Sequence, residues 1–438
     1  MKKNIILCAY GTGIGGMEVL FSGFVKYLLS HDINVILITI DRKDNIYRKL
    51  LKDEWDKIVI VYRNPDNILY MSDSSRNKQR QNIQDQLKEF DLNEAYAICG
   101  FYIDLLILID LLKEYNTKIT LIWPHPLDWI NYLPLRKNQY YFKKHRKSRH
   151  YLFQKQLFSD LEKNNASYYT SYSIYDFNCW YYELPHKQKV IEGLPVQNNA
   201  GESFIYKPIE NSNRLNIIWV GRFDYYKNDA ILYIYKCLED IKKTNPSLNI
   251  TFNIAGHGRK KFEKQLKESI HPEFITVKFL GTIKPSELNA VFSQNDIGIA
   301  MGVTVKQMGM AGLPAILIDS MSKDYKGGNC CNWLYDIFTG DDGDGMYYKM
   351  MNAPLNYRKN LKDLIEEIIQ TPASLKNISD KCKEYVVDHY SYERQYGIML
   401  DRVISSTFEP KGHYSYRYGF LRRIVRTIVK KCLMIYNG

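Results

Sequence analysis

Short apolar runs alternate with longer amphipathic runs along most of the chain, and this alternation is the feature that most limits the fold. The apolar runs of the first half, which we predict as strands, are Asn4–Ala9, Val35–Ile40, Ile58–Val61, Ala95–Gly100 and Lys118–Trp123. Met17–Leu29 has apolar residues at helical spacing, which predicts an amphipathic helix. Apolar strands that alternate with helices form a parallel sheet covered on both faces. The first half is therefore expected to be a doubly wound α/β domain.

The pattern begins again after the polar stretch Gln197–Arg214. The strands predicted in the second half are Asn216–Val220, Asn249–Ala255, Val277–Leu280, Ile297–Ala300 and Ala315–Ile318, with a helix at Asp229–Thr244. A length of 438 residues also exceeds one ordinary core. We expect two Rossmann-like domains with parallel sheets, at 1–205 and 206–390, and C-terminal helices in 391–438. Ligands of such sheets bind at the carboxyl ends of strands, so two facing sheets imply a cleft between them.

Composition restricts the partners and the location. The net charge of +12 favours an anionic partner, which leaves nucleic acid, anionic lipid and an acidic small molecule open. None of the eight cysteines forms a C-x-x-C pair, so a reduced, cytoplasmic protein is expected. The longest apolar runs fall short of the roughly 20 residues that a membrane-spanning helix needs. The protein is expected to be cytoplasmic, or peripheral on the inner face of a membrane.

A glycine-rich loop follows the first predicted strand. Gly11, Gly13 and Gly16 match the dinucleotide pattern G-x-G-x-x-G, and Asp41 ends the second predicted strand. Such glycines allow a ligand close to the backbone and to the amides of the next helix. The loop fits a nicotinamide or flavin site, a plain strand-to-helix turn, or a loop that lines a ligand cleft, and we favour the last.

Two cations follow the first strand of the second half. Gly221 and Arg222 come directly after that strand, and Lys227 lies five residues further on. An arginine can bind a diphosphate in a forked manner, while a lysine supplies a point charge. A solvated loop with an Arg222–Asp224 pair is the alternative, and spacing alone does not decide between the two.

A second turn precedes a helix in the same half. Gly302-Val303-Thr304 follows the strand Ile297–Ala300, and Thr304 with Gln307 matches a capping box. On that reading the two side chains bind the free amides of the first turn. The same amides and the helix dipole would also attract a phosphate, if a ligand takes those that Thr304 leaves.

In order, these elements resemble the C-terminal half of the retaining glycosyltransferases of family 4. The resemblance rests on Val220–Asn228, Ala255–Gly258, Leu280–Ile283, Asn295–Ile297 and Gly302–Pro314, with Gly13–Glu18 and Val190–Val196 in the first half. It covers roughly residues 4–405 and implies the GT-B fold, in which two Rossmann-like domains hold a nucleotide-sugar donor.

The resemblance also implies roles for particular residues. Arg222 and Lys227 match the cations that neutralise the donor diphosphate, and His125 falls where the family often has a histidine near the transferred sugar. An ordinary loop histidine is the alternative for His125. The positions that match donor-binding elements of the family are Gly15, Gly16, Gly221, Thr282, Ile283, Gly302, Val303, Thr304 and Gln307.

The sequence departs from the family at one acidic motif. The family often has two glutamates separated by seven residues, and here the positions hold Ile299 and Gln307. Glutamine can bind ribose hydroxyls but brings no charge. We expect no metal and no cofactor, because Arg222 and Lys227 can neutralise the diphosphate. Asp342-Gly343-Asp344 matches D-x-D in its letters but lies outside the predicted strands, so we interpret it as a turn.

Cations and aromatic residues are interleaved over Arg136–Tyr151, and Tyr416–Tyr436 has the pattern of a basic amphipathic helix. Single-stranded nucleic acid, an anionic membrane surface and a solvated helix face all fit the first stretch. Two such elements without a nucleic-acid motif favour a membrane surface over nucleic acid.

These observations favour a glycosyltransferase that moves a hexosyl or N-acetylhexosaminyl group from a UDP-linked donor, with retention. The expected acceptor is a glycan or a lipid-linked glycan, in surface polysaccharide or glycolipid assembly. Three alternatives stay open: a sugar-nucleotide epimerase of GT-B fold, a nicotinamide-dependent oxidoreductase that uses Gly11–Gly16, and a non-catalytic partner in a transferase complex.

Overall fold

The computed structural model describes residues 3–10, 15–40, 45–123, 145–186, 191, 193–196, 213–320, 328–353, 355, 357–411 and 414. The chain forms two compact units, and each is described here by itself. The first unit comprises Met1–Thr170, Asn178–His186 and Tyr396–Gly438, and the second comprises Ser171–Phe177 and Lys187–Gln395. The sequence placed the divisions at 205 and 390, with the C-terminal helices as a separate part. By contacts, the chain from Tyr396 onward belongs to the first unit.

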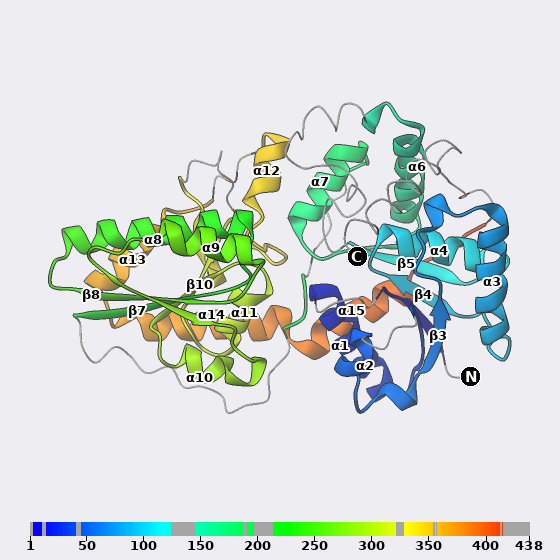
Figure 1. Ribbon diagram of the computed structural model, residues 1–438, viewed down its shortest axis with the longest axis horizontal. Helices are drawn as coiled ribbons and strands as arrows, with labels where there is room; N and C mark the ends of the chain where they lie inside the picture. The colour runs from blue at the N-terminus through cyan, green and yellow to red at the C-terminus, as the bar shows by residue number, and fades with distance from the viewer. Residues whose placement is uncertain are drawn as a thin grey trace. The chain divides into compact units, whose positions relative to one another are not determined.

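The first unit is built on a six-stranded parallel sheet in the order β3-β2-β1-β4-β5-β6 (Figure 1). Its strands are β1 (Asn4–Cys8), β2 (Asn34–Ile40), β3 (Val59–Arg63), β4 (Tyr96–Cys99), β5 (Lys118–Trp123) and β6 (Ser167–Tyr169). Its helices are α1 (Gly16–Ser30), α2 (Ile46–Leu50), α3 (Asp73–Leu87), α4 (Tyr102–Leu112) and α6 (Arg149–Lys163), with short 3-10 turns η1 (Trp55–Lys57) and η2 (Ile68–Tyr70). The central strands β1 and β2 are buried almost throughout, as an apolar run covered on both faces requires.

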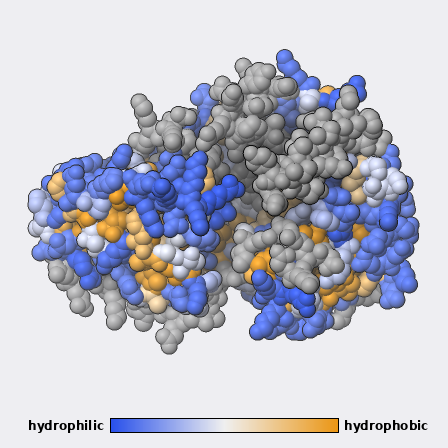
Figure 2. Space-filling view, viewed as in Figure 1, coloured by the Kyte–Doolittle hydropathy of each residue, from blue (hydrophilic) through white to orange (hydrophobic). Residues whose placement is uncertain are grey.

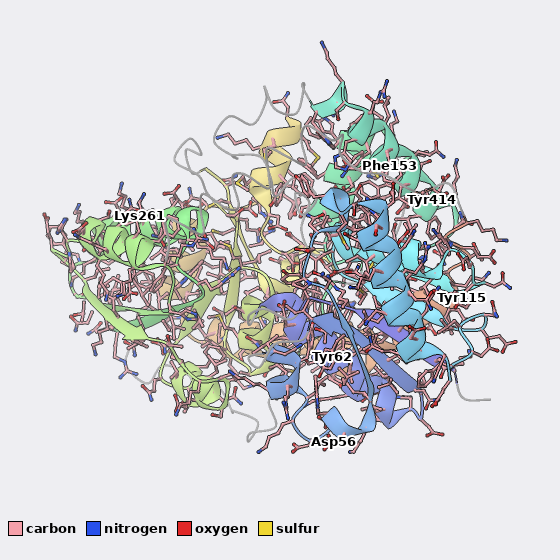
Figure 3. All side chains as sticks on the ribbon, turned by 45° about the vertical axis from the view of Figure 1, so that its right-hand side comes forward. Asp56, Tyr62, Tyr115, Phe153, Lys261 and Tyr414 are labelled. Atoms are coloured by element: carbon pink, nitrogen blue, oxygen red, sulfur yellow. The ribbon has the colours of Figure 1, made fainter. Side chains whose placement is uncertain are left out.

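Two helices, α7 (Tyr172–Tyr182) and α15 (Tyr392–Ile404), carry the chain from one unit into the other. The C-terminal part of α15 packs on α1 within the first unit. A Cβ on Gly23 would lie 2.0 Å from the hydroxyl oxygen of Tyr396, which itself donates to the carbonyl of Leu20 at 3.0 Å. Farther along, Tyr414 lies beside α6 and donates to Asp160 at 2.8 Å (Figure 3). The segment after α15 is thus bound to the first unit by specific contacts.

The second unit repeats the architecture with the sheet order β12-β11-β10-β7-β8-β9. Its strands are β7 (Arg214–Val220), β8 (Asn249–Ala255), β9 (Thr276–Gly281), β10 (Ile297–Ala300), β11 (Ala315–Ile318) and β12 (Cys331–Trp333). The five predicted strands are parallel, which confirms the prediction, and β12, which was not predicted, runs antiparallel to β11.

Helices cover both faces of this second sheet. They are α8 (Tyr225–Thr244), α9 (Lys260–Ser269), α10 (Leu288–Phe292), α11 (Val303–Met310), α12 (Gly345–Met351), α13 (Leu361–Gln370) and α14 (Ser374–Tyr390), with 3-10 turns η5 (Pro285–Glu287) and η6 (Leu334–Asp336). A single core joins the sheet to these helices other than α12 and includes the fully buried Trp219 and Trp333. Hydrophilic side chains gather over α8 and α9 on the face shown in Figure 2.

Both sheets have the same strand order when each is numbered from its own first strand. In each unit the first and fourth strands are neighbours, β1 beside β4 and β7 beside β10. The strand order reverses between these neighbours, and the crevice outside their carboxyl ends is where open α/β sheets bind ligands. In the second unit this switch point lies between the segments that follow Val220 and Ala300.

Candidate functional site

Two glycine-rich loops lie against each other after β7 and β8. The amide of Gly221 donates to the carbonyl of Ala255 at 3.1 Å, and the amide of Phe223 donates to His257 at 2.8 Å. Gly256 has a φ of +148°, and a Cβ there would lie 1.9 Å from the carbonyl oxygen of Gly221. Because only glycine permits this approach, the pairing of the two loops fixes the backbone on both sides of Arg222.

Arg222 and Lys227 lie at the start of α8, at the carboxyl end of β7. Asp224 is the N-cap of α8, and its carboxylate accepts from the amide of Lys227 at 3.0 Å. Arg222 is exposed and Lys227 is half-buried. Within the described part of the chain, neither side chain has a hydrogen bond or ion pair, so the predicted alternative of an Arg222–Asp224 pair is not formed.

Burial lowers the pKa of Lys227, and the positive charge of Arg222 acts in the same direction. The carboxylates of Asp224 and Asp344 oppose both effects. Two cations that repel each other, of which Lys227 is partly removed from water, leave a site that an anion would stabilise.

The helix α11 begins at the neighbouring strand end. The register pairs Ile299 of β10 with Trp219 of β7, so Gly302 and Arg222 both follow closely after paired strands. Gly302 is the N-cap, with φ +63° and ψ −139°, a conformation that favours glycine. Its amide donates to the carbonyl of Asp342 at 2.9 Å, and no side chain caps the first turn.

The predicted capping box is therefore wrong. Thr304 is the second residue of α11 and not its N-cap, because the left-handed backbone at Gly302 starts the helix two residues before the pattern requires. Because no side chain caps the first turn of α11, its backbone amides can bind an anionic ligand. Val303, Thr304 and Gln307 are all half-buried.

The segment predicted to meet a nucleobase follows β9. Gly281 has a φ of +70° and accepts at its carbonyl from the amide of Gly256 at 2.8 Å. Thr282 is exposed and Ile283 is half-buried. The structure thus joins Gly221, Gly256 and Gly281 along the ends of β7, β8 and β9.

An acidic loop, 340–344, crosses the ends of β10 and β11. Besides the Gly302–Asp342 contact, the carbonyl of Gly343 accepts from the amide of Ser320 at 2.6 Å. The Lys306 ammonium, wholly buried, binds the Asp342 carboxylate at 2.5 Å and lies 4.2 Å from the centre of the Tyr390 ring. These contacts attach the loop to the first turn of α11. Asp342-Gly343-Asp344 lies in a loop outside the strands, as predicted, and the chain bends at Gly343, which has a φ of +80°.

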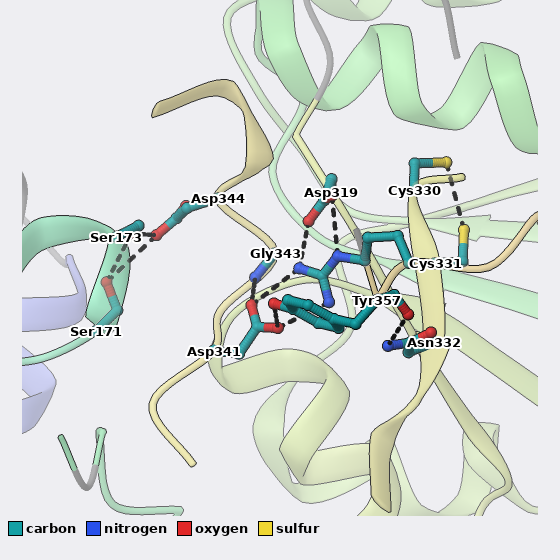
Figure 4. Close-up of polar contacts among 11 residues, drawn as sticks. Ser171, Ser173, Asp319, Cys330, Cys331, Asn332, Asp341, Gly343, Asp344 and Tyr357 are labelled. Carbon is teal, nitrogen blue, oxygen red and sulfur yellow. Dashed lines mark hydrogen bonds and ion pairs between the residues drawn. The ribbon is translucent and has the colours of Figure 1, made fainter. Parts of the chain in front are cut away.

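A buried ionic group of Arg358, Asp319 and Asp341 also binds this loop (Figure 4). Arg358 donates to Asp319 at 3.0 and 2.5 Å and to Asp341 at 2.7 and 3.0 Å. Tyr357 donates to Asp341 at 2.8 Å, and Asp341 accepts from the amide of Gly343 at 3.0 Å. Burial alone would lower the pKa of Arg358, but Asp341 and Asp319 raise it above its ordinary value. Burial raises the pKa of Asp319 to about 6 even so.

Asp344 is the last carboxylate of the loop. It accepts from Ser173 at 2.7 Å and from Ser171 at 3.4 Å, both near the start of α7 (Figure 4). It occupies the N-cap position of α12 but makes no capping hydrogen bond. Burial, followed by the negative charge of Asp342, raises its pKa to about 7.

Several predicted residues lie in or near the N-terminal loops of the first unit. Gly15, the N-cap of α1, and Gly16 follow β1, and no side chain caps that helix. His125, Gly11–Ile14 and Asp41 lie outside the described residues, as do positions 136–144 of the basic and aromatic stretch and the Tyr416–Tyr436 tail.

Neither a metal site nor a membrane-spanning helix is found among the described residues. No group of three or more histidine, cysteine, aspartate or glutamate side chains among them is placed to hold a metal ion. No helix among them is long and apolar enough to cross a membrane.

Sequence reasoning missed the charged residues that surround the predicted site. The Lys306–Asp342 pair and the Arg358 group join segments distant in sequence, and no local pattern indicates them. The D-x-D letters drew attention to Asp344, but only the position of the loop across β10 and β11 brings this residue to the site.

The fold defines the class of protein to which the chain is similar. Two Rossmann-like units of the same strand order, with C-terminal helices, form the GT-B architecture, and GT-B glycosyltransferases are among the structures that resemble it. No family model and no characterised protein sequence matches the chain.

Three solved structures illustrate the likeness. The lipopolysaccharide outer core galactosyltransferase WaaB is 16% identical over 92% of this chain and 99% of its own, with a TM-score of 0.54. The N-terminal domain of Candida albicans trehalose-6-phosphate phosphatase is 10% identical over 93% and 97%, with a TM-score of 0.54. A TarM variant from S. aureus, in complex with Fondaparinux, alpha-GlcNAc-glycerol and UDP, is 11% identical over 92% and 99%, with a TM-score of 0.52. Identities this low establish the fold alone.

Proposed function

We propose that this chain is a glycosyltransferase that moves a sugar from a nucleotide-sugar donor, UDP-linked, to a glycan acceptor. One observation carries the proposal. Arg222 and Lys227 lack ionic partners among the described residues and lie at the switch point of the second sheet, beside the uncapped first turn of α11. A nucleotide-sugar diphosphate carries two negative charges and fits a site with two cations and helix amides.

The proposed chemistry depends on stabilising the departing nucleotide. The bond between the anomeric carbon and the β-phosphate oxygen breaks, and its electron pair stays on that oxygen. The acceptor hydroxyl forms the new bond to the anomeric carbon and gives its proton to the departing phosphate. Arg222, Lys227 and the α11 amides stabilise the growing negative charge. Retention of configuration, a hexosyl or N-acetylhexosaminyl donor and a role in surface polysaccharide assembly belong to the same proposal.

The remaining donor contacts follow the loop geometry. Thr282 and Ile283 extend from the joined glycine loops and are proposed to meet the nucleobase, while Gln307 is proposed to bind the ribose. The UDP in the TarM complex supports the choice of nucleotide. Gly15, Gly16 and His125 are proposed to lie near the transferred sugar and the acceptor. No metal or cofactor takes part in this scheme.

An anionic membrane surface is proposed as a further partner, and nucleic acid is not. In the first unit Trp180 is 37% exposed and Leu152 is 60% exposed. Arg146 lies 4.9 Å from the centre of the Trp180 ring and donates to the Trp180 carbonyl, and Lys147 and Arg149 are exposed nearby in sequence. Exposed aromatic and apolar side chains with cations fit the interface of an anionic bilayer. Trp180→Ala with Leu152→Ser should reduce binding to phosphatidylglycerol vesicles, and equal binding would contradict this part.

The central test replaces Arg222 or Lys227 by alanine and measures the binding and turnover of UDP-sugars. Each change should weaken donor binding about 10- to 100-fold, because a hydrogen bond to a charged group contributes about 1.5–3 kcal/mol. Lys261→Ala is the matched control, since Lys261 is an exposed cation on α9 of the same unit (Figure 3). Unchanged binding in both Arg222→Ala and Lys227→Ala would overturn the proposal.

The same assays separate the alternatives. An epimerase would convert the UDP-sugar without an acceptor, and a non-catalytic partner would bind it without turnover. An oxidoreductase that uses the Gly11–Gly16 loop would be stabilised against thermal unfolding by NAD and not by UDP.

A further inference from the structure

A wholly buried lysine lies in α11, the helix whose first amides belong to the proposed donor site. The Lys306 side chain is 0% exposed, and its ammonium binds the Asp342 carboxylate at 2.5 Å. A lysine is almost never fully buried unless it is paired. A buried ion pair is weak evidence for stability, because the cost of removing both charges from water offsets their attraction. The position of this pair is therefore more informative than its energy.

Asp342 contacts α11 at two points that lie one turn apart. Its carbonyl accepts from the amide of Gly302, the N-cap, at 2.9 Å, and its carboxylate binds Lys306, four residues further along. Residues four apart lie on the same side of a helix. Asp342 therefore holds one side of the first turn, with its main chain at the N-cap and its side chain one turn later.

These contacts leave the other amides of the first turn open. The first four amides of an α-helix have no acceptor within the helix, and in α11 they belong to Gly302, Val303, Thr304 and Val305. The amide of Gly302 donates to Asp342. A capping side chain would instead accept from the second or third helical residue, here Thr304 or Val305. Asp342 thus fixes the start of the helix without using the amides that a phosphate would bind.

We infer that Lys306 is a positioning residue for the donor diphosphate, an inference that rests on the proposed function of the Arg222–Lys227 site. Lys306 holds Asp342 against α11, and Asp342 holds the N-cap. The amides of Val303 and Thr304 therefore keep the direction in which they bind the diphosphate. Because Lys306 has no exposed surface, it acts through Asp342 and not by contact with the donor.

An aromatic residue completes the attachment. The Lys306 ammonium lies 4.2 Å from the centre of the Tyr390 ring, a distance at which a cation is attracted to an aromatic face. The Tyr390 hydroxyl accepts from the amide of Gly340 at 2.9 Å, two residues before Asp342. Lys306 thus contacts both residues, Asp342 and Tyr390, that attach this end of loop 340–344 to the helices of the unit.

The test replaces the ion pair by neutral residues of similar size. Lys306→Met alone would leave Asp342 without its cation, so its effect on binding could not be separated from a loss of stability. Lys306→Met/Asp342→Asn removes both charges and should keep a Tm close to that of the wild type. In calorimetric titration its affinity for UDP should fall about tenfold, because misdirected amides lose a hydrogen bond to the charged diphosphate.

Uridine, which lacks the phosphates, distinguishes positioning from a general disturbance of the unit. The proposed base contacts, Thr282 and Ile283, follow β9, the edge strand that β7 and β8 separate from β10. Gln307, the proposed ribose ligand, lies in the second turn of α11, which the fully buried Val305 and Met308 fix in the core. The affinity for uridine, measured by ligand-observed NMR, should therefore be the same in the double variant and the wild type.

Two further variants complete the design. Lys359→Met/Asp336→Asn is the matched control, because it removes a largely exposed pair of the same unit, and it should bind UDP as the wild type does. Tyr390→Phe keeps the ring beside Lys306 but loses the hydrogen bond to Gly340. It should weaken UDP binding by about threefold and leave uridine binding unchanged.

Each outcome has a defined meaning. Wild-type affinity for UDP in the double variant, or an equal loss for UDP and uridine, overturns the role of Lys306 and leaves the donor site standing. If the double variant does not fold, wild-type affinity for UDP in Tyr390→Phe overturns it in the same way. If none of UDP, GDP and dTDP binds the wild type, the proposed donor site is wrong and this inference is wrong with it.

Discussion

Replacing Arg358 by methionine should destabilise the second unit strongly, and the loss should depend on pH. The guanidinium makes two hydrogen bonds to each of Asp319 and Asp341, and all three side chains are at most 5% exposed. Methionine fills most of the volume, so the main effect is two carboxylates left buried without a cation. Removing one partner of a buried pair costs about 3–5 kcal/mol.

The carboxylates can avoid part of this cost by taking up protons. Protonating a carboxyl group of ordinary pKa near 3.9 costs about 4 kcal/mol at pH 7 and about 1.5 kcal/mol at pH 5. In the variant the pKa of Asp319, which burial already raises to about 6 in the folded wild type, rises further above its unfolded value. A raised carboxyl pKa adds stability as the pH falls through it, so the deficit should shrink by about 2 kcal/mol between about pH 7 and pH 5.

Urea unfolding followed by circular dichroism measures the loss, and hydrogen exchange of the peptides over 315–345 assigns it to the second unit. For a unit of about 200 residues, 3–5 kcal/mol corresponds to a fall in Tm of about 6–20 °C. Arg358→Lys, which keeps the charge but not the fork, should lie between the two proteins.

Lys359→Met is the matched control, because its pair with Asp336 is largely exposed and contributes less than about 1 kcal/mol. A loss below about 1 kcal/mol in Arg358→Met, or an equal loss at both pH values, would refute the reasoning.

Three further changes test other contacts. Gly256→Ala places a Cβ 1.9 Å from the carbonyl oxygen of Gly221 and should displace the loop that carries the proposed diphosphate ligands. UDP binding should weaken at least about tenfold, and binding at the wild-type level would contradict the loop pairing. Gly23→Ala places a Cβ 2.0 Å from the Tyr396 hydroxyl and should lower the free energy of unfolding by more than the roughly 1 kcal/mol expected for Tyr396→Phe, which loses only a hydrogen bond; thermal unfolding of both variants compares them. Asp104→Asn leaves its buried arginine partner in the first unit unpaired and should cost about 3–5 kcal/mol, whereas a neutral result in urea unfolding would show that the pair contributes nothing.

The apolar strands were the part of the fold most accessible from sequence. Lys118–Trp123, Asn249–Ala255, Ile297–Ala300 and Ala315–Ile318 were predicted with the bounds the structure has. Three of these strands are buried almost throughout and read as continuous apolar runs, whereas Asn249–Ala255 alternates between buried and half-buried residues. The three-residue edge strands β6 and β12 were missed because they are too short to show a period.

Contacts that depend on tertiary structure were not predictable in the same way. Thr304 and Gln307 have the letters of a capping box, but the backbone of Gly302 decides where α11 begins. Likewise the loop at Asp342-Gly343-Asp344 was predicted from its residues, whereas its position across the ends of β10 and β11 follows from strand order. Local patterns thus indicated where loops lie along the chain, but backbone conformation and strand order determine where a helix begins and which residues a loop contacts.

The net charge near the proposed donor site depends on contacts that only the tertiary structure shows. The sequence predicts a site with two cations and with a neutral Gln307 where the family often has a glutamate. Such a site has a net positive charge and should attract anions. The structure adds the carboxylate of Asp344 from a distant loop, and this carboxylate opposes a diphosphate when it is ionised. Gln307 cannot titrate, whereas Asp344, with a pKa of about 7, can remove its own charge by binding a proton. A carboxylate from a distant loop thus limits the positive charge near the site, and no local pattern in the sequence indicates it.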